Sequence, residues 1–201
     1  MILLLDVSSP IPEFHLINYN KIIHSTIIIK NTNKKLSNDL IPTYLEINKN
    51  YNLCNNLEKL IITIGPGSYT ALRVGASFIA GLSQSLDLPV AEVSTETVYD
   101  FICKDNKNLA IYFESSNNQH FLSFKKDSKF IHEKIENNKY LLNISISHIL
   151  YNNNFPNFIS KNIIINSFSI KKIVIENLNK LDFKKNIIIK PIYISNNPIL
   201  N

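Results

Sequence analysis

Apolar and polar positions in the first half of the chain follow the pattern of a strand meander that gives way to alternating helices and strands. Apolar or alternating runs predict strands at residues 2–7, 13–18, 21–30, 60–64 and 90–93. The second and third of these form a hairpin around Tyr19 and Asn20. Apolar residues at helical spacing predict helices over residues 36–48 and 68–86, with Pro42 as a kink or start of the first. This order is typical of a layered α/β domain.

The second half repeats this order less clearly. Strands are expected at residues 109–113, 119–125, 129–135, 159–165 and 187–193, and a weak helix at residues 145–151. A clearer amphipathic helix is built on Ile170, Ile173, Val174, Leu178 and Leu181. The repetition predicts a duplicated α/β fold, with residues 1–98 as the first half and residues 99–201 as a degenerate second half. The last strand is a candidate to return to the first half.

Composition narrows the class of protein. The chain has 201 residues, of which 45% are hydrophobic, so it can bury a sizeable core. No apolar run is long enough for a membrane-spanning helix, and the N-terminus lacks the basic segment of a signal peptide. Cys54 and Cys103 form no C-x-x-C pair, and the histidines have no metal-ligand spacing. We therefore expect a cytoplasmic protein without a metal site.

The net charge of +5 is unevenly distributed. Residues 1–98 carry seven basic and eight acidic side chains, and residues 99–201 carry fourteen and eight. Twenty of the twenty-one basic residues are lysines, which favours codon bias as the origin of much of this charge. Direct nucleic-acid binding by the basic second half stays an alternative, and it predicts a strong dependence of affinity on salt.

The residues that stand out against this bias gather in one stretch. All four glycines lie between positions 65 and 81, and so does Arg73, the only arginine. Gly65 and Gly67 allow backbone angles closed to other residues, and Ser68 can cap the helix that follows. The helix N-terminus attracts anions. The residues of this turn and candidate anion site are Gly65, Gly67, Ser68, Thr70 and Arg73, and a tight turn with a cap alone is the other interpretation.

The helix after this turn is unusually poor in charge. From Tyr69 to Leu86, Arg73 is the only charged residue. Ala71/Gly75 and Ser77/Gly81 are pairs of small residues four apart, which permit close approach of a neighbouring backbone. A helix without a solvated face is covered on both sides. The cover is either this chain itself or another subunit, and the sequence leaves both open.

These motifs resemble a known family. The stretch Gly65-Pro66-Gly67-Ser68-Tyr69-Thr70 with Arg73-Val74-Gly75 is similar to the signature G-P-G-S-[FY]-T-x-x-R-[IV]-G of TsaB (YeaZ) proteins. Four further stretches resemble motifs of this family: Leu5-Asp6-Val7-Ser8-Ser9, Leu88-Pro89, Val93-Ser94-Thr95 and Pro191-Ile192-Tyr193. The likeness is dense over residues 1–98 and thin over residues 99–190. Ser195 stands where the family has an arginine, and Glu114-Ser115-Ser116 stands in place of its D-A-R.

The resemblance implies an actin-like (ASKHA, Gcp-like) fold of two ribonuclease-H-like halves. It also implies a role in making threonylcarbamoyladenosine on tRNA, as the dimerisation subunit that supports TsaD, with TsaE as an ATPase partner and tRNA bound through the complex. The family interface is built from the first two helices, and a homodimer on the same surface stays open. The partner-binding residues that follow are Leu36, Leu40, Tyr44, Ile47, Val74, Ser77, Phe78, Gly81 and Ser85.

The resemblance together with missing residues predicts that the chain is not an enzyme by itself. TsaD holds its metal with two histidines on its first helix, and residues 35–44 contain none. Residues 82–201 contain no glycine for loops that approach phosphate. Asp6 alone is a poor magnesium site. We expect no cofactor on the isolated chain and ATP or ADP only within the complex; the alternative is a degenerate actin-like phosphotransferase that binds ATP.

Overall fold

The computed structural model describes residues 1–29, 35–103, 108–114, 120–126, 129–135, 146–152 and 163–194. The first half contains β1 (Ile2–Asp6), β2 (Glu13–Asn18), β3 (Lys21–Ile27), α1 (Leu36–Tyr51), α2 (Leu53–Asn56), β4 (Lys59–Gly65), α3 (Tyr69–Leu86), β5 (Val90–Ser94) and α4 (Thr95–Ile102). The second contains β6 (Leu109–Glu114), β7 (His120–Lys126), β8 (Lys129–Ile135), β9 (His148–Asn152), β10 (Ile164–Phe168), α5 (Ile170–Glu176) and a 3-10 turn (Leu178–Lys180).

Two five-stranded sheets share one topology. The first has the strand order β3-β2-β1-β4-β5 and the second the order β8-β7-β6-β9-β10. In each sheet the first three strands form an antiparallel meander, and the last two run parallel to the first strand of that meander. This repetition confirms the duplicated α/β fold of actin-like type that the sequence predicts.

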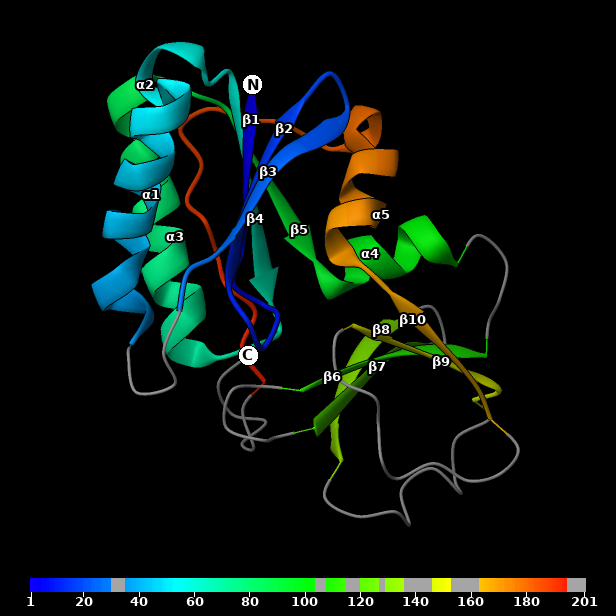
Figure 1. Ribbon diagram of the computed structural model, residues 1–201. Coiled ribbons are helices and arrows are strands. Elements are labelled where there is room, and N and C mark those ends of the chain that lie inside the picture. Colours follow the sequence, from blue (N-terminus) through cyan, green and yellow to red (C-terminus); the bar gives the residue numbers. More distant parts are fainter. Residues whose placement is uncertain are drawn as a thin grey trace.

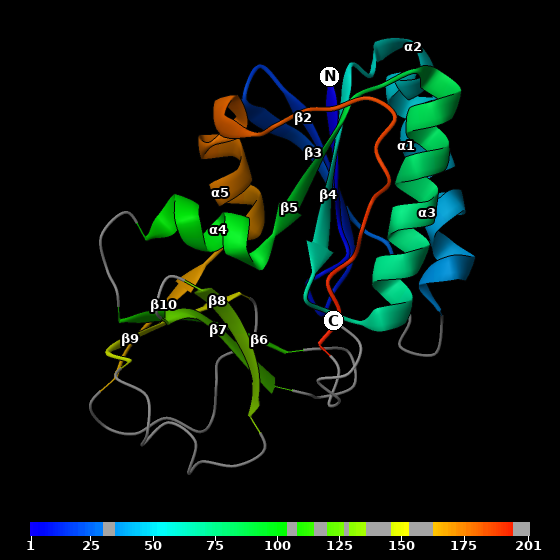
Figure 2. The ribbon, with the colours of Figure 1, turned by 180° about the vertical axis from the view of Figure 1, so that it is seen from behind.

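Helices cover both faces of the first sheet (Figures 1 and 2). α1 and α3 pack on one face, and α4 and α5 lie on the other, with the second sheet beyond α4. The side chains of β1 alternate accordingly: Leu3 and Leu5 belong to the core under α1 and α3, and Leu4 belongs to the core under α4 and α5. β1 and β4 run towards the second half (Figure 1), and Asn152 of β9 bonds to Ser9 just after β1, so the carboxyl ends of these strands face the second half.

A segment late in the chain returns to the first half, beside α3 and the first sheet (Figure 2). We call residues 184–194 the strap. Lys184 and Val90 exchange two backbone hydrogen bonds of 2.8 and 3.0 Å, and the Ile192 N–H donates to the Ile64 carbonyl at 2.7 Å. The expected strand at residues 187–193 is wrong as secondary structure, because only an isolated bridge forms at Lys184.

Three further elements differ from the prediction. Residues 148–152 form strand β9, where a helix was expected, because both neighbours, β6 and β10, pair with this segment. Helix α4 was not expected; Ser94 begins it with a capping box to Thr97. Helix α1 begins at Leu36 and continues past Pro42 to Tyr51. Part of the expected strand at residues 159–165 lies outside the described residues, and β10 begins at Ile164.

His15 is a buried base in the first sheet. Its side chain is 1% exposed, with Nδ1 2.8 Å from Ser25 Oγ and Nε2 3.3 Å from Glu13 Oε2. Burial, and then the charge of Lys171, lower the pKa of His15 from 6.5 to about 4. The Lys171 ammonium also lies 3.6 Å from the Glu13 carboxylate, so it offsets the attraction of that carboxylate for a protonated ring. The ring is neutral at neutral pH.

We expect the free energy of unfolding to fall as the pH drops from 6.5 towards 4, because only the unfolded chain then binds a proton at His15. The stabilisation is complete above the unfolded pKa and is lost near the folded one; the shift corresponds to about 3 kcal/mol. Urea unfolding across this range, for wild type and His15→Gln, measures the effect. Since glutamine does not titrate, the variant should lose less stability; parallel curves for the two proteins would contradict the assignment.

Candidate functional site: a groove between two helices

α1 and α3 border a groove of about 410 Å³ on the outside of the first half. Its lining is mostly apolar and consists of Ser37, Leu40, Ile41, Arg73, Val74, Ser77 and Phe78. Ile41 and Leu45 of α1 are 55% and 56% exposed, which is high for large aliphatic side chains. The two helices that the resemblance names as an interface thus form a continuous open surface with apolar walls.

The four residues expected on α1 have another position. Leu36, Leu40, Tyr44 and Ile47 are buried in the core between α1 and the first sheet. Leu40 still contributes to the floor of the groove. The prediction of a partner-facing surface is corrected for these side chains, because the strongest apolar stripe of a helix marks its core face. Ile41 and Leu45, which the sequence analysis missed, are the exposed apolar residues of this helix; a second stripe four residues apart is their only signal.

Three of the expected residues of α3 lie on its outer side, and the other two, Val74 and Phe78, also pack against the core. Ser77, Gly81 and Ser85 are exposed, and Val74 and Phe78 are half-buried. A Cβ atom added to Gly81 would meet nothing within 4 Å. The opposite side is packed within the chain: a Cβ atom on Gly75 would lie 2.9 Å from the methyl groups of Val7. The chain itself therefore explains the small residues on one face of α3 and leaves the other face uncovered.

The turn before α3 depends on its first glycine. Gly65 has a φ of +104°, and a Cβ atom there would lie 2.7 Å from the Ile192 carbonyl oxygen of the strap. Gly67 has no positive φ, but its Cβ would lie 3.0 Å from Ser8 Cα. Ser68 occupies the N-cap position without a side-chain capping bond, so the predicted cap is wrong. Thr70 is exposed, and anion binding at this helix end stays a prediction.

Arg73 is held in an aromatic cluster at one end of the groove. Its guanidinium donates a 3.0 Å hydrogen bond to Tyr69 Oη and lies 5.2 Å from the centre of the Tyr69 ring. That ring packs against Tyr193 of the strap, with a centroid separation of 4.6 Å. The sequence could not predict this contact, because the two tyrosines are far apart along the chain.

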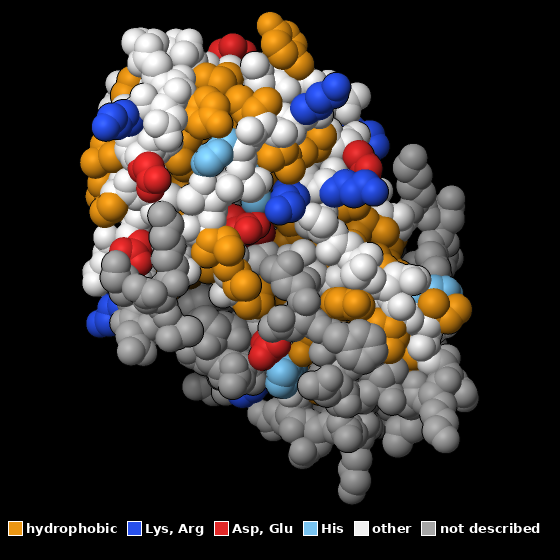
Figure 3. Space-filling view, in the orientation of Figure 1, with side chains coloured by type: hydrophobic (Ala, Val, Ile, Leu, Met, Phe, Trp, Pro, Cys, Tyr) orange, Lys and Arg blue, Asp and Glu red, His pale blue; other side chains and the backbone are white. Residues whose placement is uncertain are grey.

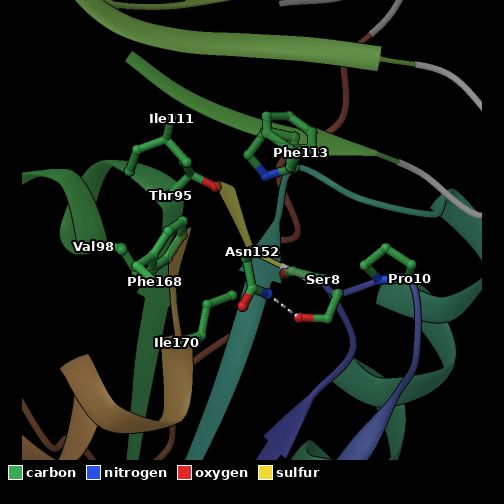
Figure 4. Close-up of a pocket in the computed structure, with 11 residues that line it drawn as sticks. Ser8, Pro10, Thr95, Val98, Ile111, Phe113, Asn152, Phe168 and Ile170 are labelled. Atoms are coloured by element: carbon green, nitrogen blue, oxygen red, sulfur yellow. Dashed lines mark hydrogen bonds between the residues drawn. The ribbon is translucent and has the colours of Figure 1, made fainter. Parts of the chain in front are cut away.

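A second candidate is the cleft between the two halves (Figure 4). A chain of hydrogen bonds beside it starts from Asp6. The buried Asp6 carboxylate accepts bonds from the Ser9 hydroxyl at 2.5 Å, the Thr63 hydroxyl at 2.9 Å, and the backbone N–H groups of Ser8 and Ser9 at 3.1 and 3.2 Å. Asn152 of β9 donates to Ser9 Oγ at 2.7 Å. This chain of bonds joins the two halves.

The cleft does not fit the nucleotide and metal that bind between the halves of an actin-like phosphotransferase. The space has a volume of about 20 Å³, enough for one water molecule, and apolar side chains such as Val98, Ile111 and Phe168 line it. The Asp6 oxygens already accept bonds from this chain. Within the described ranges, no group of three or more His, Cys, Asp and Glu side chains could hold a metal ion. The groove is therefore the better candidate site.

Charge does not mark a second site on the face shown in Figure 3. Lys and Arg side chains there lie among Asp and Glu side chains, and hydrophobic atoms show between them. Ion pairs on the surface of the molecule include Lys125 with Asp100 and Lys185 with Asp87. No helix in the described part of the chain is long and apolar enough to cross a membrane.

Comparison with known proteins adds family evidence. A family model for TsaD, tRNA N6-adenosine threonylcarbamoyltransferase, matches residues 22–178. The tRNA threonylcarbamoyladenosine biosynthesis protein TsaB of Bacillus subtilis (strain 168) is 42% identical over 40 residues, which are 20% of this chain and 18% of that protein. The curated match thus spans less than a fifth of that relative.

Two solved structures share the fold over nearly their whole length. They are YeaZ from Pseudomonas aeruginosa, with a TM-score of 0.64, and an uncharacterized protein with similarity to peptidase YeaZ, also from Pseudomonas aeruginosa, with a TM-score of 0.62. Each is 12% identical and the alignment covers 96% of this chain and 99% of that chain. At this identity the likeness shows the fold alone.

Two glycines of the α3 region should respond oppositely to alanine. Gly65→Ala should destabilise the protein by about 1–3 kcal/mol, because the positive φ and the Ile192 carbonyl both oppose a side chain. Gly81→Ala, the matched control, should leave stability unchanged or raise it by up to about 1 kcal/mol, since an open helical position gains propensity. Chemical unfolding measures both; equal stabilities of the two variants would contradict the geometry of this turn.

Proposed function

This chain belongs to the TsaB (YeaZ) family, and we propose that it is the non-catalytic subunit that binds and supports TsaD in forming threonylcarbamoyladenosine on tRNA. TsaD then transfers threonylcarbamoyl to the adenosine beside the anticodon. In this proposal tRNA is bound through the complex, in the cytoplasm, and ATP or ADP acts only there, with TsaE. This chain contributes a docking surface for TsaD.

The groove between α1 and α3 carries the proposal. Its walls present Ile41, Val74 and Phe78, and the outer face of α3 continues it with the small residues Ser77 and Gly81. Apolar walls lose contact with water when a partner helix docks, and small residues let its backbone approach closely. Gly81 has open space beside it, so this chain does not itself cover that face.

TsaD is favoured over a second copy of this chain as the occupant. A twofold dimer would bring the same surface against itself. The groove lining contains Arg73 and no carboxylate, so a second copy brings no negative charge to the only cation of the lining. A homodimer that competes with TsaD for the groove would contradict the choice of TsaD as its occupant.

The absence of catalysis by this chain alone is supported by its chemistry. The sequence has no histidine in residues 35–44 and no glycine in residues 82–201. Asp6 is bonded to Ser9 and Thr63 within the chain. The alternative of a degenerate phosphotransferase requires ATP in a cleft of about 20 Å³. Saturable binding of ATP by the isolated chain would favour that alternative.

A charge in the groove should block docking and leave the fold intact. Ser77→Glu and Ile41→Glu place a carboxylate at exposed positions, so both variants should fold. Binding to TsaD should weaken by about 2–5 kcal/mol, because docking takes the new carboxylate out of water; at position 77 the only cation of the described lining beside it is Arg73, four residues earlier, and a pair with it would take Arg73 away from the partner. Calorimetric titration with TsaD measures the loss, and circular dichroism checks the fold. Ser167→Glu, at an exposed position of β10, is the matched control; folded Ser77→Glu and Ile41→Glu variants that bind as well as this control would refute the docking surface.

The isolated chain should not modify tRNA. Incubated with tRNA and threonylcarbamoyl-adenylate, it should give no more threonylcarbamoyladenosine than a reaction without protein, because residues 35–44 contain no histidine pair for a metal and the described cleft between the halves has a volume of only about 20 Å³. Mass spectrometry of the digested tRNA is the measurement. Modified nucleoside above this background, with TsaD shown to be absent, would overturn the non-catalytic assignment.

A further inference from the structure

Arg73 is the one charged side chain in the lining of the groove. Its guanidinium is exposed, and none of the ion pairs among the described residues includes it. The chain uses lysine at its twenty other basic positions. A planar guanidinium differs from an ammonium in presenting a fixed fork of donors, which matches a carboxylate. The choice of arginine here therefore indicates a directional contact.

The surroundings of Arg73 fix its position before any partner binds. One N–H bonds to Tyr69 Oη at 3.0 Å, and the guanidinium carbon lies 5.2 Å from the centre of the Tyr69 ring. Tyr193 of the strap supports that ring from the other end of the chain, at 4.6 Å between centroids. Arginine has five N–H donors, so most of them are left for another acceptor. Because the Arg73 side chain is already held in place, it loses less conformational entropy when a partner binds.

Docking of a partner in this groove would take Arg73 out of water. A buried cation without an opposite charge opposes binding strongly. The described residues that line this groove supply no carboxylate, so the partner must. We propose that TsaD presents an aspartate or glutamate that pairs with the Arg73 guanidinium at the end of the α1–α3 groove, next to an apolar segment that covers Ile41, Val74 and Phe78. This inference rests on the proposed function and specifies its partner surface.

A carboxylate of a protein fits these observations better than a phosphate of RNA. The same groove presents apolar side chains beside Arg73, and a sugar-phosphate backbone offers them no apolar surface to bury. Residues 1–98, which form both helices, carry one more acidic than basic side chain, so this half has no positive excess to attract RNA. The tRNA contact is kept as an outcome of the test.

The test measures affinity for TsaD by calorimetric titration with three variants. Arg73→Glu should weaken binding at least about 30-fold, because it places two carboxylates together, and Arg73→Gln should weaken it less. Lys129→Glu makes the same change of charge at an exposed position on β8 in the second half, and should alter the affinity less than about twofold. Added salt should weaken the wild-type complex more than the Arg73→Gln complex.

A covalent experiment identifies the carboxylate. Arg73→Lys places a primary amine in the groove, which a carbodiimide couples directly to a neighbouring carboxylate with loss of water. Mass spectrometry of the crosslinked complex should find a peptide of TsaD attached at this position. That peptide should contain an aspartate or a glutamate. Wild type, with arginine at this position, should give no crosslink there.

The outcomes separate this inference from the proposal on which it rests. If Arg73→Glu binds TsaD as Lys129→Glu does while Ile41→Glu fails to bind, the groove is the docking surface and the carboxylate pairing is wrong. If Arg73→Glu and Ile41→Glu both bind normally, the docking surface itself is wrong. If Arg73→Glu keeps TsaD but the complex loses affinity for tRNA, Arg73 contacts RNA and the carboxylate pairing is overturned.

Discussion

The segment after β1 lies so close to the start of α3 and the turn before it that no side chain fits at Gly67 or Gly75. A Cβ atom on Gly75 would lie 2.9 Å from Val7, and one on Gly67 would lie 3.0 Å from Ser8. One residue further, Ser9 receives the hydrogen bond of Asn152 from the second half. The first sheet, the groove helix and the second half thus meet at residues 7–9. The position of α3, and with it one wall of the groove, depends on this contact.

Both faces of the first sheet pack in apolar cores, but the carboxyl ends of β1 and β4 and the outer sides of α1 and α3 have opposite properties. Towards the second half, polar side chains such as Asp6 and Thr63 satisfy one another and leave space for about one water molecule. On the outer sides of α1 and α3, apolar side chains line the open groove. Buried polar groups that are fully bonded favour one arrangement of the halves.

The sequence predicted the first half well because its local signals agree with its tertiary contacts. The hairpin turn at Tyr19 and Asn20 has two positive φ angles, as a tight two-residue connection requires. In the second half, the apolar residues of β9 suit either a helix or a strand, and only pairing with β6 and β10 decides. The sequence therefore predicted a helix in place of β9, and it predicted a strand at residues 187–193 that does not form.

The candidate site could be predicted only in part. Charge depletion drew attention to α3, whose outer side carries exposed Ser77 and Gly81; that this side binds a partner stays a prediction. The apolar spacing on α1 identified the face that packs on the sheet, where Leu40 and Ile47 are buried. It did not identify the face that is open to solvent. The support of Arg73 by a tyrosine of the strap depends on a contact that no local pattern encodes.

The strap has a consequence for how the molecule is made. Residues 184–194 bond to Val90 and Ile64 and lie over Gly65, all elements of the first half. When β1 to β5 have left the ribosome during synthesis, the segment that later pairs with β5 at the edge of their sheet has not yet been made. Contacts over such separations slow folding, because the intervening chain must be ordered first. The ring contact between Tyr193 and Tyr69, which supports Arg73 at the end of the groove, therefore forms only after the second half has been synthesised.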